Sequence, residues 1–114
     1  MDHMEIVAKA KTVAYAAGKA YLDRYYDGED HGACGFAWVT IYPKHKGNTK
    51  AGKEERRILR EMGFELDWTG KRFEWWNPSG LPVQNIEAKH VGAQAAADLL
   101  KTHGFTAFSG CRLD

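Results

Sequence analysis

The chain has 114 residues, 44% of them hydrophobic and four of them tryptophan, which predicts one domain over residues 1–114 with a single hydrophobic core. This composition excludes a disordered chain, and no apolar run approaches the ~20 residues that span a bilayer. A net charge of +1 gives no global attraction to polyanions, so any binding of nucleic acid must come from locally clustered cations. With two cysteines and no signal-peptide pattern, the sequence indicates a soluble protein of the reducing cytoplasm.

The first predicted element is a helix over residues 4–25, because this segment is rich in alanine and its apolar residues recur at spacings of three and four. These residues are Ile6, Ala10, Val13, Ala17 and Tyr21. Two glycines and three acids in residues 26–32 end the helix. A run of β-branched and aromatic residues from Cys34 to Tyr42 then predicts a strand that Pro43 stops, with both of its faces covered.

The rest of the chain predicts two more helices, a β-hairpin and a final strand. These elements are a helix over residues 50–62, hairpin strands over 64–68 and 71–76, a helix that Asn85 caps and that runs to Thr102, and a strand over 105–113. The hairpin follows from aromatic residues alternating with charged ones on either side of Thr69-Gly70. Gly63 stands where a left-handed C-terminal cap would end the first of these helices.

This order predicts an α+β fold in which an N-terminal helix precedes a ferredoxin-like βαββαβ sandwich with a four-stranded antiparallel sheet over residues 34–114. The first and third strands should be central, with two helices on one side of the sheet. We expect the N-terminal helix to cover the other side or an edge, because that topology leaves one face bare. The first and last strands should be neighbours, which would place Cys34 near Cys111 as free thiols.

A basic segment is the best candidate for a binding site. Seven of the 16 Lys and Arg residues lie in residues 44–60, where a glycine-containing loop leads into the second predicted helix. Helical spacing turns the cations of that helix away from Ala51, Ile58 and Met62. Loop amides at a helix N-terminus also attract anions. The candidate ligand-binding residues are Lys44, Lys46, Gly47, Asn48, Thr49, Lys50, Gly52, Lys53, Arg56, Arg57 and Arg60.

The alternative interpretation of this segment is a solvated basic surface with internal ion pairs. Arg57 and Glu61 are one helical turn apart, as are Lys50 and Glu54, and such pairs would simply support the helix. Both interpretations remain open from the sequence alone.

Residues 47–53 also have the spacing of a nucleotide-hydrolase phosphate loop, but the match fails at the next residue. Glu54 stands where Ser or Thr would hold magnesium, and no apolar strand ending in Asp follows. His31 and Cys34 do not complete a zinc or calcium motif. The other histidines lack an associated nucleophile or carboxylate at a recognisable spacing. The sequence therefore predicts no enzyme, no metal site and no cofactor.

Six aromatic residues fall on the two strands that should be central: Phe36, Trp38, Tyr42, Phe73, Trp75 and Trp76. RNA-recognition sheets stack bases from this position. Packing in the core is the favoured interpretation, because the N-terminal helix is expected on the same face and the aromatic pattern of that module is missing. Trp76 is out of phase with its neighbours, so it is a candidate exposed anchor for a partner.

The stretch from Gly35 to Asp114 resembles a group of small uncharacterised proteins encoded by bacteriophages and prophages. The resemblance lies in four segments, which read Tyr-Pro-Lys-His-Lys-Gly-Asn-Thr over 42–49, Asp-Trp-Thr-Gly-Lys over 67–71, Trp-Trp-Asn-Pro-Ser over 75–79 and Arg-Leu-Asp over 112–114. It implies a phage origin and a place in the host cytoplasm. For small phage proteins without catalytic residues, it also implies action by binding.

Two functions are therefore expected from the sequence. The first is non-enzymatic binding of a phosphate-rich ligand, above all nucleic acid or a nucleotide, on the basic loop and helix. The alternative is a phage-type inhibitor that binds a host defence protein through the same basic face and Trp76.

Overall fold

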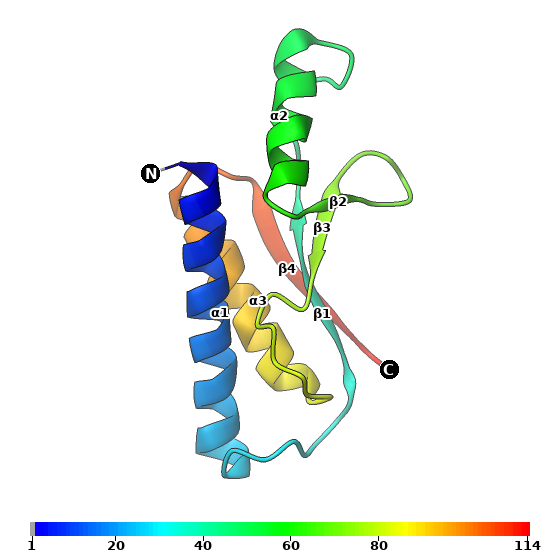
Figure 1. Cartoon of the computed structure of the whole chain (residues 1–114). Helices are drawn as coiled ribbons and strands as arrows, with labels where there is room; N and C mark the ends of the chain where they lie inside the picture. The colour runs from blue at the N-terminus through cyan, green and yellow to red at the C-terminus, as the bar shows by residue number, and fades with distance from the viewer. Residues whose placement is uncertain (1) are drawn as a thin grey trace.

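Three helices and four strands make up the computed structural model, which describes residues 2–114 (Figure 1). In chain order they are α1 (His3–Tyr26), β1 (Gly35–Ile41), α2 (Lys50–Glu61), β2 (Glu65–Leu66), β3 (Phe73–Trp76), α3 (Ile86–Thr102) and β4 (Ala107–Leu113). Within these residues, no helix combines the length and the apolar character needed to cross a membrane.

The four strands form one antiparallel sheet in the order β2-β3-β1-β4, so β1 and β3 are central. The predicted α+β class, with an N-terminal helix and a four-stranded antiparallel sheet, is confirmed. The predicted pairing of the first and last strands is also confirmed, but the cysteines are not opposite each other. Cys111 pairs with Ala37, whereas the carbonyl of Cys34 accepts a hydrogen bond from the amide of Asp114, and both thiols are free.

The prediction that α1 covers the other face or an edge of the sheet is wrong. Figure 1 shows α1 beside α3, on the same side of the sheet as the other helices. The reason is a matching set of small residues on the two helices, which lets their backbones approach closely. A Cβ added at Gly18 would lie 3.0 Å from the carbonyl oxygen of Ala88, and one at Gly92 would lie 2.9 Å from that of Ala14.

The hydrophobic core lies between this helix layer and one face of the sheet. Ala37, Val39 and Ile41 of β1 point into it, as the alternation along a strand requires. Leu59 of α2 and Leu100 of α3 are buried in the same cluster. Asn85 caps α3 as predicted, with its side-chain oxygen accepting a hydrogen bond from the amide of Ala88 at 2.8 Å.

The β2–β3 hairpin is shorter than predicted. β2 contains two residues, and Trp68, which was predicted to lie on a strand, stands in the turn with 91% of its surface exposed. The buried carboxylate of Asp67 holds this turn: it accepts bonds from the amide and hydroxyl of Thr69, from the amide of Gly70 and from Nε of Arg72 at 2.6 Å. These bonds draw the chain into a turn before a longer strand can form.

The Asp67 turn gives stability a dependence on pH. Burial alone would raise the pKa of Asp67, but hydrogen bonds from Thr69 and Arg72 outweigh it and hold the pKa below its ordinary value. The resulting stabilisation is complete above the unfolded-state pKa of about 3.9 and is lost as pH falls through the lower folded-state pKa. We expect Asp67→Asn to lower the melting temperature most at neutral pH, and the deficit to shrink in strong acid.

Thermal unfolding from pH 7 to pH 2, followed by circular dichroism, measures this deficit. Asp98→Asn is the control, because Asp98 is exposed and its one ion pair among residues 2–114 is a loose contact with Lys101 at 3.8 Å. Its melting temperature should follow that of the wild type at every pH. A deficit for Asp67→Asn that stays constant down to pH 2 would show that Asp67 acts through shape and not through charge.

Candidate functional site

The basic loop, residues 44–53, consists of an irregular stretch over 44–49 and the first turn of α2, onto which that stretch folds back. The hydroxyl of Thr49 caps the helix by accepting a hydrogen bond from the amide of Gly52 at 3.0 Å. The carbonyl of Lys46 presses on the same turn, and a Cβ added at Gly52 would lie 1.8 Å from its oxygen. Glycine is therefore needed at position 52 to bring the loop onto the helix, which accounts for part of the spacing that resembles a phosphate loop.

One pair of loop amides already holds an anion that belongs to the chain. The carboxylate of Glu55 accepts hydrogen bonds from the amides of Lys44 at 2.8 Å and His45 at 3.0 Å. A phosphate could bind these two amides only by displacing the carboxylate of Glu55. These two bonds fix the start of the loop to α2.

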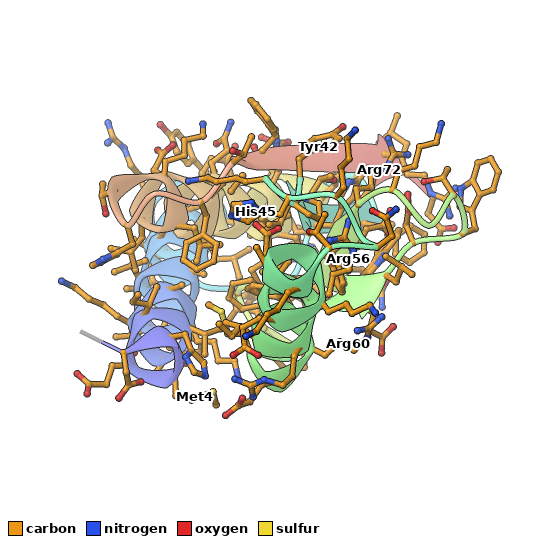
Figure 2. All side chains as sticks on the ribbon, turned by 90° about the horizontal axis from the view of Figure 1, so that it is seen from above. Met4, Tyr42, His45, Arg56, Arg60 and Arg72 are labelled. Atoms are coloured by element: carbon orange, nitrogen blue, oxygen red, sulfur yellow. The ribbon has the colours of Figure 1, made fainter. Side chains whose placement is uncertain are left out.

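The three arginines of α2 all have partners within the chain. Arg56 donates to the carbonyls of His45 at 3.0 Å and Gly52 at 3.1 Å, and so ties the loop to the helix. The guanidinium of Arg60 lies 5.6 Å from the ring centre of Phe73. Figure 2 shows Arg56 near His45, with Arg60 further along α2.

Arg57 is the most strongly paired of the three. It contacts Glu54 at 2.6 Å and Glu61 at 2.8 Å, and the hydrogen bond to Glu54 is the main reason why the pKa of Arg57 is raised. The same bond lowers the pKa of Glu54. The pairing of Arg57 with Glu61 was one of the internal pairs that the sequence left open.

The four lysines of the basic loop differ from these arginines. Lys44, Lys46, Lys50 and Lys53 are exposed, and none of them forms an ion pair within residues 2–114. Their ammonium groups are free to meet an external anion. The free cations of this surface are therefore the lysines, whereas Arg56 ties the loop to α2, Arg57 pairs with two glutamates of α2 and Arg60 lies over Phe73.

A hollow of about 580 Å³ borders the inner side of the basic loop. Ile6, Ile58 and Phe105 contribute its apolar lining, and His3, His45 and His103 stand among its polar residues. An apolar lining of this kind does not match a phosphate. No group of three His, Cys, Asp or Glu residues within 2–114 is arranged to hold a metal ion.

The second surface of interest is the side of the sheet that faces away from the helices, which we name the open sheet face. Register and side-chain alternation place ten residues on it: Phe36, Trp38, Thr40, Tyr42, Arg72, Glu74, Trp76, Phe108, Gly110 and Arg112. Phe73 and Trp75 point to the opposite side, where Phe73 is buried and Trp75 packs on Phe64. Core packing was thus the right interpretation for these two aromatic residues only.

The aromatic rings of the open sheet face form two groups. Trp76 lies 4.9 Å from Trp38 and 6.2 Å from Phe36, measured between ring centres. The second group contains Tyr42 and Phe108, whose ring centres are 5.9 Å apart. Trp76 keeps 46% of its surface exposed and Phe108 keeps 51%, so both offer ring surface to a ligand.

The sequence analysis did not identify Phe108 and Arg112 on β4 as site residues, although their even spacing along the last strand places both on one face of the sheet. Arg72 was also missed, and Figure 2 shows it beside Tyr42. Their position on one surface could be inferred only once the helices were known to lie on the opposite side. Trp76 does lie on a different face from Trp75, as its phase along the strand predicted.

Comparison of the chain with protein-family models, curated proteins and solved structures gave no match. The function must therefore be argued from the two surfaces themselves. One is a loop with four exposed lysines, and the other is a sheet face with two groups of partly exposed rings.

Proposed function

We propose that this chain is a non-enzymatic binding protein that holds a phosphate-rich ligand, namely nucleic acid, on the basic loop and the start of α2. The single observation that carries this proposal is the set of lysines at 44, 46, 50 and 53, which form no ion pair within residues 2–114 of a protein of net charge +1. Clustered ammonium groups attract phosphate oxygens without requiring a particular base sequence. The hydrogen bonds within the loop add support, because Thr49, Glu55 and Arg56 hold the backbone that carries the lysines in one conformation.

The salt dependence of binding tests the proposal. We expect a fluorescently labelled oligonucleotide of 20 nucleotides to bind the wild-type protein at 50 mM salt. If four phosphates are neutralised, the slope of log affinity against log salt should be about −3 for a single strand. Fluorescence anisotropy at several salt concentrations between 50 and 200 mM gives both quantities. Absence of binding at 50 mM salt would remove nucleic acid as the ligand.

The second candidate function is inhibition of a host defence protein through the basic loop together with Trp76. The observation in its favour is the 46% exposure of Trp76, which suits an aromatic anchor in a protein interface. Such an interface depends less steeply on salt than phosphate binding does. A host protein that binds with little salt dependence, together with no oligonucleotide binding, would favour this candidate.

We also infer that the last six elements are a variant of the ferredoxin-like arrangement. The strand order β2-β3-β1-β4, with β1 and β3 central, supports this inference. The variant is distinguished by α1, which packs beside α3. This placement leaves the open sheet face available to a ligand.

A further inference from the structure

We infer that the open sheet face stacks the bases of a single-stranded nucleic acid whose phosphates reach the basic loop. Because this inference rests on the proposed nucleic-acid binding, it specifies the form of the ligand at that same site. Base stacking on aromatic rings tolerates any sequence, since every base has a π-face. It also requires bases that are not already stacked and paired in a duplex.

The first support is the arrangement of the rings. The indole of Trp38 packs directly on β4 at Gly110, where an added Cβ would lie only 2.7 Å from it. The indole N–H of Trp76 donates to the carboxylate of Glu74 at 2.8 Å, which fixes that ring in turn. Trp38 and Tyr42 are four residues apart on an extended segment, which separates them by about 13 Å along the chain. The two ring groups are therefore two separate stacking surfaces that follow one another along β1.

The second support is charge, which favours a polyanion over a second copy of the chain. Cations accompany the rings on the β4 edge: Arg112 lies 5.5 Å from the ring centre of Phe36, and Lys101 lies 5.3 Å from that of Phe108. Guanidinium and ammonium groups beside exposed rings are the combination that single-strand-binding grooves use.

The third support is continuity with the basic loop. Tyr42 directly follows β1 and lies on the open sheet face, and Lys44 begins the basic loop two residues later. A single-stranded nucleic acid whose bases stack on the open sheet face can therefore place its phosphate backbone on the lysines at the same end of the sheet. Glu74 is the acid on this face, and its carboxylate is bonded to Trp76. Glu74→Gln should strengthen binding a few-fold by removing repulsion.

The test compares Trp76→Ala with Trp76→Phe and with Tyr15→Ala in the full chain. Tyr15 is the matched control, because it is 48% exposed but lies on α1. The probes are a 20-nucleotide thymidine DNA, the corresponding uridine RNA, and a 20-base-pair duplex, each at 50 mM salt. We expect single strands to bind at least tenfold more tightly than the duplex. Trp76→Ala should lose about tenfold in single-strand affinity, which corresponds to one base stack.

Trp76→Phe should keep most of the single-strand affinity, and Tyr15→Ala should keep all of it. Circular dichroism melting shows whether Trp76→Ala remains folded, and Phe108→Ala provides a second variant on the other ring group. Equal duplex and single-strand affinity with no effect of Trp76→Ala would overturn the inference and leave the proposed function standing. Light scattering that shows a dimer broken by Trp76→Ala, with unchanged nucleic-acid affinity, would also overturn it. No binding of any probe would instead refute the proposed function.

Discussion

Gly92→Leu is expected to destabilise the protein by about 3 kcal/mol and to lower its melting temperature by about 10 °C or more. Gly92 lies where α3 meets α1, and an added Cβ would be 2.8 Å from the Cβ of Ser79 as well as 2.9 Å from a backbone carbonyl of α1. A backbone atom cannot rotate away as a flexible side chain does, so the two helices must separate. Thermal and urea unfolding followed by circular dichroism measure the loss.

Gln94→Leu is the control for Gly92→Leu. It adds the same side chain two residues away on the same helix, at an exposed position. It should change the free energy of unfolding by no more than about 0.5 kcal/mol. If both variants unfold at the wild-type temperature, α1 and α3 do not pack as closely as their small residues indicate.

The combined variant Lys46→Gln, Lys50→Gln and Lys53→Gln is expected to lose about 100-fold in oligonucleotide affinity at 50 mM salt. Each lysine that neutralises a phosphate contributes about 0.7 to the slope of log affinity against log salt, so the slope should become less steep by about 2. Stability should change little, since the three side chains are exposed and form no ion pair within residues 2–114. Anisotropy titrations over a range of salt concentrations measure both effects.

The matched control is Lys9→Gln, Lys11→Gln and Lys19→Gln on α1. It removes the same net charge from exposed positions of another surface. Its salt slope should equal that of the wild type, with only a small loss of affinity from the altered overall charge. Equal losses in the two triple variants would mean that net charge, and not the basic loop, drives binding.

Much of the fold could be predicted because its signals are local. Asn85 and Gly63 mark helix ends through side-chain capping and a left-handed backbone, with φ of +98° at Gly63. The placement of α1 could not be predicted, since periodicity reveals a buried stripe but not the surface that it meets. The Ala and Gly residues that both α1 and α3 contain were the feature of the sequence that indicated close packing of the two helices.

The candidate site was predicted less completely. The sequence identified the cations of the basic loop, but not that Glu55 would bind the amides of Lys44 and His45. That contact joins residues ten and eleven positions apart, which helical spacing cannot reveal. The open sheet face depends in turn on the position of α1, so Phe108 and Arg112 could not be grouped with Trp76 beforehand.

The most direct measurement of the central claim is hydrogen exchange of the wild-type protein with and without a saturating single-stranded oligonucleotide, read by mass spectrometry of peptides. We predict slower exchange in peptides covering residues 44–53, because a ligand bound to the lysine side chains would restrain the opening of the loop. Peptides from α1 should exchange at the same rate in both samples. Unchanged exchange over residues 44–53 in a sample where anisotropy shows full binding would contradict the claim, because the ligand would then occupy another surface.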